Sequence, residues 1–194
     1  MITLYPTETL YALGVNALDE GAVRMLYALK GRSDSKSSSW LVRDIEDIRK
    51  YAEVGKVAEG IARRFLPGPL TLVLKASDDV PVWAKAEDGT IALRISSDVK
   101  AQELIESYMH EHNAPLTCTS ANISGAPTLQ TPQEILQQFG PKAKQITEII
   151  DDGPRKSLAT TIVRVLDGDV SILREGDITE QDILQCVKEI RSDF

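Results

Sequence analysis

Short apolar segments alternate with amphipathic segments along this chain, but the alternation is irregular, and this limits the possible folds more than any other feature. Several apolar segments follow one another toward the C-terminus with no helical segment between them. A regular doubly wound sheet has a helix between successive strands. The sequence therefore predicts an α/β fold with a mixed sheet. The segments expected to form strands are 2–5, 40–42, 70–74, 90–95, 116–119, 146–150, 160–165 and 170–173.

The helical segments carry start signals. Thr131-Pro132-Gln133-Glu134 is a capping box with proline at the first helical position, so a helix is expected from there. Asp19 precedes apolar residues at helical spacing as far as Lys30 and is expected to cap that helix, and Asp44 is expected to cap the next one. Further helices are expected over 54–65, over 100–111 and from Thr179 onward.

Composition limits the class of protein. At 194 residues the chain has the length of one domain, 1–194, with a substantial core. No apolar run approaches the roughly 20 residues of a membrane span, and the N-terminus lacks a signal-peptide pattern. The net charge of −7 argues against a protein that coats nucleic acid through its overall charge. Cys118 and Cys186 form no close pair, so we expect two reduced, buried thiols in a cytoplasmic protein without membrane contact.

Two stretches far apart in the chain are candidates for binding a polyanion. Lys30-Gly31-Arg32, followed by Lys36, places three cations near the end of an expected helix, and arginine can grip phosphate oxygens with two hydrogen bonds. Ser120-Ala121-Asn122-Ile123-Ser124-Gly125 follows an expected strand, at a sheet edge where α/β folds bind ligands. Each stretch also has a plainer explanation, as a solvated helix end and as a loop that caps its own backbone. Both explanations stay open at this point.

Other polar positions are weaker signals. Glu8 lies in a polar turn between apolar segments and could be structural, whereas the neighbouring threonines could bond a ligand. Arg94 and Arg174 each end an expected apolar strand. An arginine in such a place is either a surface residue or a clamp for an anion. His110 and His112 do not share a helix face, and motifs for zinc, a serine nucleophile or a dinucleotide are absent. The chemistry is therefore expected to depend on charge stabilisation and positioning.

Eight short motifs, spread over nearly the whole chain, have a characteristic order. They are Pro6–Tyr11, Lys30-Gly31-Arg32, Pro67–Thr71, Leu93-Arg94, Thr119–Gly125, Asp152-Gly153-Pro154, Thr160–Val163 and Leu173–Gly176. Through these stretches the chain resembles the YrdC family of threonylcarbamoyl-adenylate synthases. One such match is weak, whereas eight in the same order do not arise readily by chance.

The resemblance implies a twisted mixed parallel and antiparallel sheet with surrounding helices and a concave basic face, in the family's short, single-domain form. It implies a nucleotidyltransferase that joins L-threonine, bicarbonate or carbon dioxide, and ATP into threonylcarbamoyl-AMP and pyrophosphate. Mg²⁺ would accompany ATP, with no protein-only metal site. Downstream enzymes would pass the threonylcarbamoyl group to tRNA, and direct contact with tRNA or double-stranded RNA stays open.

The resemblance also implies roles for particular residues. Those expected to be catalytic are Lys30, Arg32, Ser120 and Asn122. Those expected to bind ATP are Arg32, Lys36, Thr90, Ser120 and Arg174. Those expected to bind threonine are Thr9, Arg94, Cys118 and Thr160, with Arg94 on the α-carboxylate. The carbamate of threonine is already an anionic nucleophile, so such a site mainly needs cations and fixed donors that bring two polyanions together.

The chain departs from the family pattern at several positions without losing a catalytic residue. Ala12 replaces a glycine, Ser33 and Ser96 each replace a proline, Ser37-Ser38 replaces a Pro-Leu pair, and Thr160 replaces a serine. These changes are expected to affect substrate affinity and loop order more than the type of reaction.

Two other functions are alternatives. A catalytically inactive module of the same fold could bind tRNA or double-stranded RNA, although the net charge of −7 weakens this interpretation. Steep salt dependence of RNA binding without ATP turnover would favour it. A carbamoyl-handling relative, like the YrdC-like part of hydrogenase-maturation proteins, would carry zinc-ligand cysteine pairs, which this sequence lacks.

Overall fold

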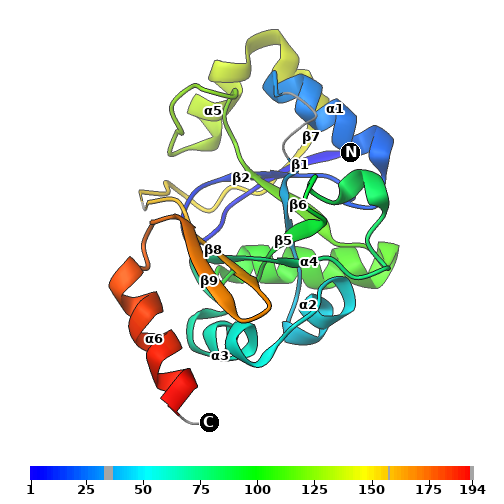
Figure 1. Ribbon diagram of the computed structural model, residues 1–194. Coiled ribbons are helices and arrows are strands. Elements are labelled where there is room, and N and C mark those ends of the chain that lie inside the picture. Colours follow the sequence, from blue (N-terminus) through cyan, green and yellow to red (C-terminus); the bar gives the residue numbers. More distant parts are fainter. Residues whose placement is uncertain (33–36, 157, 193–194) are drawn as a thin grey trace.

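A single twisted sheet runs through the molecule and positions every other element (Figure 1). The computed structural model describes residues 1–32, 37–156 and 158–192. Across these residues the sheet has nine strands in the order β7-β1-β2-β6-β3-β5-β4-β8-β9. The strands are β1 Ile2–Tyr5, β2 Ala12–Gly14, β3 Ser39–Leu41, β4 Leu70–Lys75, β5 Thr90–Arg94, β6 Leu116–Ser120, β7 Ile146–Ile149, β8 Thr161–Leu166 and β9 Asp169–Arg174.

Neighbouring strands run in both directions. The pairs β1 with β7, β3 with β5, and β4 with β8 are parallel. The other five neighbouring pairs are antiparallel. The predicted mixed sheet is therefore confirmed. The strand β2 was not expected from the sequence, because three residues are too short to show an apolar period and β2 is defined by its pairing with β1 and β6.

The helices begin where their capping residues predict. Asp19 accepts a hydrogen bond from the backbone of Ala22 at 3.0 Å, and Thr131 forms a capping box with Glu134. At its C-terminus the first helix stops at Gly31, whose φ of +62° lies in the left-handed region that favours glycine. The α-helices are α1 Glu20–Lys30, α2 Ile45–Tyr51, α3 Lys56–Phe65, α4 Val99–His112, α5 Pro132–Phe139 and α6 Glu180–Ser192. The 3₁₀ helices are η1 Val82–Ala84 and η2 Gly140–Gln145.

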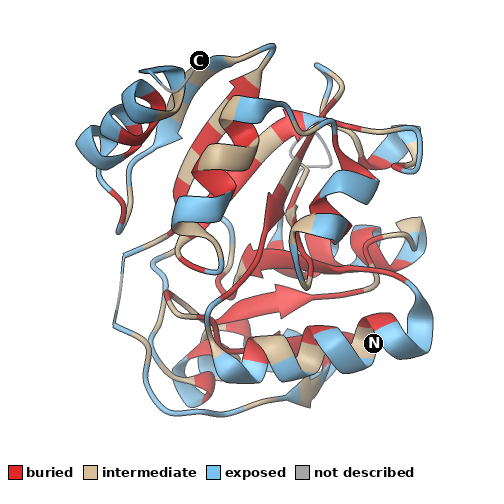
Figure 2. Ribbon diagram, turned by 90° about the horizontal axis from the view of Figure 1, so that it is seen from below, coloured by how far each residue is buried: buried red, intermediate tan, exposed pale blue. Residues whose placement is uncertain are grey.

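The helices form two apolar clusters with the sheet. The larger cluster joins α2, α3, α4 and α6 to strands β3 to β6 and β8. The smaller cluster joins α1 and α5 to β1, β2 and β7, and these elements lie together at one end of the molecule in Figure 1. Figure 2 shows that the strands are mostly buried and that the helices expose one side. This division leaves one face of the central strands without a helix from either cluster.

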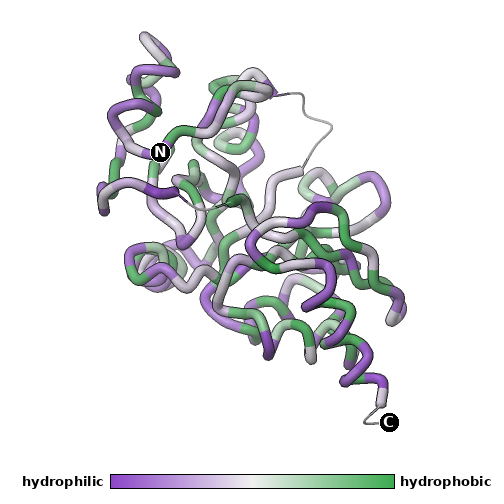
Figure 3. The backbone as a smooth tube through the Cα atoms, turned by 90° about the vertical axis from the view of Figure 1, so that its left-hand side faces the viewer, coloured by the Kyte–Doolittle hydropathy of each residue, from purple (hydrophilic) through white to green (hydrophobic). Residues whose placement is uncertain are grey.

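The C-terminal helix closes the larger cluster. Hydrophilic and hydrophobic residues alternate along α6 as far as the C-terminus in Figure 3. Its apolar side packs on α3, where Gly60 lies under Ile190, and Arg64 pairs with Glu189 at 2.7 Å. Both cysteines are buried and free, as predicted. Within the described ranges, no helix has the length and apolar character that a membrane crossing requires.

Candidate active site

A cavity of about 890 Å³ lies on the face of the sheet opposite the larger apolar cluster. Successive side chains of a strand point to opposite faces, and three central strands show this alternation. Their apolar residues in the core are Leu70, Leu72, Leu74, Ile91, Leu93, Val163 and Val165. The residues between these line the cavity: Thr71, Val73, Thr90, Ala92, Arg94, Ile162 and Arg164. The floor of the cavity is therefore set by a period of two on β4, β5 and β8.

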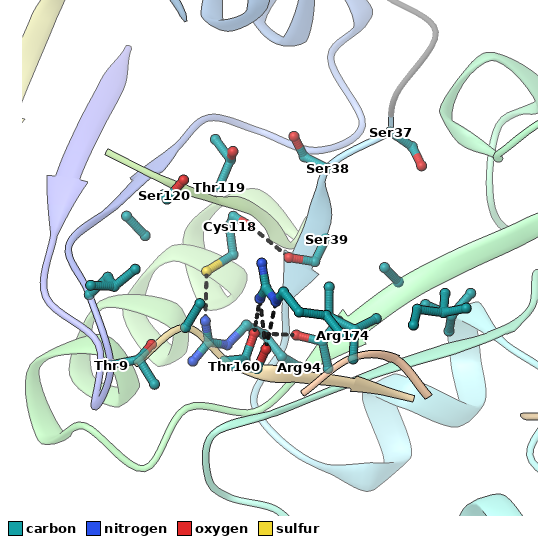
Figure 4. A pocket seen from close by; sticks show the side chains of 18 of the residues that line it. Thr9, Ser37, Ser38, Ser39, Arg94, Cys118, Thr119, Ser120, Thr160 and Arg174 are labelled. Atoms are coloured by element: carbon teal, nitrogen blue, oxygen red, sulfur yellow. Dashed lines mark hydrogen bonds between the residues drawn. The ribbon is translucent and has the colours of Figure 1, made fainter. Parts of the chain in front are cut away.

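Eight of the eleven predicted site residues line this cavity, and Figure 4 labels six of them. The eight are Thr9, Arg32, Thr90, Arg94, Cys118, Ser120, Thr160 and Arg174. They come from six segments that are distant in sequence and that the sheet brings together. Lys30 and Asn122 lie outside the lining, and Lys36 and Ser33 lie outside the described residues.

Arg94 is the most deeply buried cation of the cavity wall. Only 6% of its surface is exposed. Its Nη2 donates to Glu8 Oε1. Its Nη1 lies 3.7 Å from Cys118 Sγ, and Figure 4 marks this contact with a dashed line. Its Nε has no hydrogen-bond partner in the described part of the chain. A buried guanidinium with a donor left over is suited to an anionic ligand.

Arg174 approaches the cavity from the edge strand β9. It donates from Nε and Nη2 to the carbonyl oxygen of Thr160 at 3.0 and 2.7 Å, and from Nη2 to the Thr160 hydroxyl at 3.0 Å. Burial and the positive charge of Arg94 lower the pKa of Arg174. Two mutually repelling guanidinium groups therefore face one cavity, and an anion placed between them would relieve the repulsion.

Threonine hydroxyl groups near these arginines are held in place by hydrogen bonds to neighbouring groups. Thr160 Oγ1 lies 3.2 Å from Thr71 Oγ1 across the parallel pair β4 and β8. Thr9 Oγ1 lies 3.1 Å from Thr7 Oγ1, whose hydroxyl also donates to the carbonyl of Leu10. The bonds of Thr7 hold the polar turn between β1 and β2, which forms one wall of the cavity.

Arg32 lies at another wall, just after α1. Its Nη2 donates to the carbonyl of Ser37 at 2.8 Å, and its Nη1 donates to the hydroxyls of Ser38 and Thr119 at 3.3 Å each. The guanidinium carbon lies 5.2 Å from the centre of the Tyr27 ring. Among the residues that the structure describes, no carboxylate pairs with Arg32, and its guanidinium lines the cavity, where it could meet an anionic ligand.

Lys30 and Asn122 support the serine-rich loop from behind. The Lys30 ammonium donates to the backbone carbonyls of Ser120 and, at 2.9 Å, Asn122. The Asn122 amide donates to Ile123 and Ala126 carbonyls, and its Oδ1 accepts from the Ser120 hydroxyl at 2.6 Å. Burial and the charge of Arg32 lower the pKa of Lys30 to about 8. Lys30 therefore adds charge and order to the loop without reaching the cavity surface.

Sequence reasoning missed an ion pair in the cavity wall. Asp88 accepts from the Thr90 hydroxyl at 2.6 Å and pairs with Arg164 Nη2 at 2.9 Å. The sequence pattern did indicate that Arg164 faces the cavity. On β8, Ile162 and Arg164 alternate with buried valines, and on β4, Thr71 and Val73 alternate with leucines in the same way. The partner of Arg164 could not be read from this pattern, since it lies on a loop 76 residues earlier in the chain.

The described residues offer no metal centre built from protein side chains. Over residues 1–32, 37–156 and 158–192, no three His, Cys, Asp or Glu side chains come close enough to hold an ion. A cation that neutralises a bound triphosphate would be held mainly by the phosphate oxygens.

The mixed sheet and its cavity of arginines and hydroxyls define an α/β protein whose cavity has the charge and the hydrogen-bond donors that suit an anion. The chain belongs to the Sua5/YciO/YrdC family, because the family model described as "Telomere recombination" matches residues 1–176.

Curated relatives carry consistent names. A putative threonylcarbamoyl-AMP synthase of Methanocaldococcus jannaschii is 38% identical over 187 residues, which are 95% of this chain and 84% of that protein. The threonylcarbamoyl-AMP synthase of Pyrococcus abyssi is 35% identical over 192 residues, and the human one is 30% identical over 183 residues. This chain spans 54% of the length of the Pyrococcus protein and 62% of the human protein.

Solved structures show the same fold. P. abyssi Sua5 complexed with L-threonine matches with a TM-score of 0.87 at 34% identity, over 97% of this chain and 54% of that one. E. coli YciO matches with a TM-score of 0.82 at 27% identity, over 94% of this chain and 86% of that one. The fold expected from the resemblance is therefore confirmed.

Proposed function

We propose that this protein is a threonylcarbamoyl-AMP synthase, which converts L-threonine, bicarbonate or carbon dioxide, and ATP into threonylcarbamoyl-AMP and pyrophosphate. The observation that carries the proposal is the match over 97% of the chain to a Sua5 structure that contains L-threonine. The synthase names of relatives from archaea, bacteria and human support it over an inactive RNA-binding module.

The part of the cavity around Arg94 is proposed to bind threonine. Arg94 would hold the α-carboxylate through the N–H groups that face the cavity, and Thr9 would bond the amino acid from the turn before β2. Cys118 and Thr160 would border its side chain, because both line the same region as Arg94. Arg174 and Thr90 would contact the nucleotide.

The opposite wall is proposed to bind the phosphates. Arg32 and Ser120 line the cavity there, and Lys30 and Asn122 order the loop that carries Ser120. Lys36 is proposed to assist the triphosphate. Mg²⁺ would enter with ATP and offset the charge of its phosphates.

The proposed reaction needs little proton transfer from the protein. The threonine amine loses a proton and forms an N–C bond with carbon dioxide, which yields a carbamate anion. A carbamate oxygen then attacks the α-phosphorus of ATP, and pyrophosphate leaves. Two anions must meet in this step, so fixed cations such as Arg32 lower the barrier by favouring the charge of the transition state. Downstream enzymes would transfer the threonylcarbamoyl group to tRNA.

An ATP–pyrophosphate assay tests the proposal. Pyrophosphate should be released only when ATP, L-threonine and bicarbonate are all present, and threonylcarbamoyl-AMP should appear in equal amount by mass spectrometry. Release that does not depend on threonine would refute the proposed function. Salt-sensitive binding of double-stranded RNA with no pyrophosphate release would favour the RNA-binding alternative instead.

A further inference from the structure

Glu8 lies behind Arg94 rather than on the cavity surface. The described residues that line the cavity include Arg94 but not Glu8. The Glu8 side chain is 14% exposed and the Arg94 side chain 7% exposed, so the pair is nearly removed from water. A carboxylate in this place cannot reach a ligand directly, but it can act on the ligand through the guanidinium.

Both oxygens of the Glu8 carboxylate are engaged. Oε1 accepts from Arg94 Nη2, and Oε2 accepts from the Ser96 hydroxyl. The Ser96 oxygen in turn accepts from the backbone N–H of Asp98, which caps α4. Glu8 is thus anchored to the end of β5 and to the start of α4, and it transfers this rigidity to Arg94.

A fixed guanidinium binds a carboxylate better than a mobile one. A free arginine side chain has considerable rotamer entropy, part of which is lost when the side chain is immobilised. If the side chain is ordered before the ligand arrives, that loss no longer opposes binding. Arg94 is ordered in this way, because Glu8 holds Nη2 while Nη1 faces Cys118.

The charges near Glu8 also suit anionic ligands. Glu8 contributes one negative charge beside the positive charges of Arg94 and Arg174. One positive charge is left for the two anions that the proposed function places here, the carboxylate at Arg94 and the nucleotide at Arg174. A buried cation without any counterion would destabilise the folded protein, so Glu8 also makes the arginine pair tolerable in the absence of substrate.

We propose that Glu8 is a positioning residue for the amino-acid substrate, which locks Arg94 through the Glu8–Ser96 hydrogen bond so that its remaining N–H groups meet the α-carboxylate. This inference rests on the proposed function, because it takes the ligand of Arg94 to be an amino acid. Glu8 itself contacts neither the reacting carbamate nor the phosphates.

Steady-state kinetics and calorimetry of the Glu8→Ala variant test the proposal. The KM for L-threonine and its Kd without ATP should rise about tenfold, equivalent to about 1.4 kcal/mol. The KM for ATP should stay within about twofold, and kcat at saturating threonine within about threefold. Glu8→Gln should recover part of the loss, because its amide oxygen can still accept from Arg94. The matched control is Glu53→Ala, which removes an exposed partner of Lys75 and should change neither KM.

Ser96→Ala keeps the experiment decisive if Glu8→Ala does not fold. It removes one of the two bonds to Glu8 and should raise the KM for threonine about threefold with the KM for ATP unchanged. Equal rises in both KM values would indicate a merely structural role and overturn the proposal, as would a fall in kcat with unchanged threonine affinity. A wild-type protein that releases no pyrophosphate refutes the proposed function, whereas an active wild type with an unaltered Glu8→Ala variant refutes this inference alone.

Discussion

Replacing Lys30 by methionine tests whether the buried Lys30 ammonium lowers the free energy of unfolding. Lys30 is only 2% exposed, and its Nζ donates to the carbonyls of Ser120 and Asn122. Burial, with a smaller contribution from the charge of Arg32, lowers its pKa from 10.5 to about 8. Methionine has a similar length but no charge, so the variant removes the ammonium while it keeps most of the packing.

The lowered pKa of Lys30 sets the direction in which the free energy of unfolding changes with pH. Below the folded pKa of about 8, both the folded and the unfolded chain hold the proton, and the destabilising effect of burial is constant. As the pH rises from about 8 toward 10.5, the folded chain loses the proton first, so the free energy of unfolding increases. Each pKa unit corresponds to about 1.4 kcal/mol, so Lys30 should contribute a gain of about 2 kcal/mol between about pH 7.5 and about pH 10.

Urea unfolding of the wild type and of Lys30→Met at these two pH values measures this gain. The other titrating groups are common to both proteins and should largely cancel in the difference. The wild type should gain about 2 kcal/mol relative to the variant as the pH rises. Equal pH dependence of the two proteins would refute the reasoning, because it would mean that the Lys30 ammonium has an ordinary pKa in the folded state.

Two further predictions concern the cavity walls. Arg32→Ala should lower turnover at least about tenfold, about 1.4 kcal/mol of transition-state stabilisation, with little change in melting temperature; a folded variant with full turnover would remove Arg32 from the reaction. Gly176→Ala should destabilise the protein by about 2 kcal/mol or more and weaken threonine binding, because a Cβ would lie 1.9 Å from the Ala159 carbonyl, next to Thr160. The control Gly55→Ala has no atom within 4 Å of the added Cβ and should lose well under 1 kcal/mol, so equal losses in melting experiments would contradict this explanation.

The sequence motifs indicated several residues that share one cavity, but they did not indicate what surrounds those residues. Arg32, Arg94 and Arg174 do line one cavity, as the motifs implied. Lys30 was expected beside the phosphates, but in the fold its ammonium is used by the loop carbonyls behind the cavity wall. The sequence showed the spacing of Lys30 and Arg32 but not the direction in which each side chain leaves the end of α1.

Features that depend on neighbours within a few residues could be read from the amino-acid order. Asp19 and Thr131 start their helices because each bonds a backbone N–H three residues later. The strands β4, β5 and β8 were visible as short apolar segments for a similar reason, since alternation is local. The family could also be recognised at this level, from motifs that keep their order along the chain.

Which side chains act together depends on the packing of the whole sheet. Glu8 meets Arg94 across 86 residues, and Asp88 meets Arg164 across 76 residues. Such pairs depend on the order and register of all nine strands of the described sheet, and a shift of one residue in one strand would turn its polar side chains into the core. Register is a property of the whole packed sheet, so no local pattern could have predicted that Glu8 lies behind Arg94 or that Arg174 lies beside it.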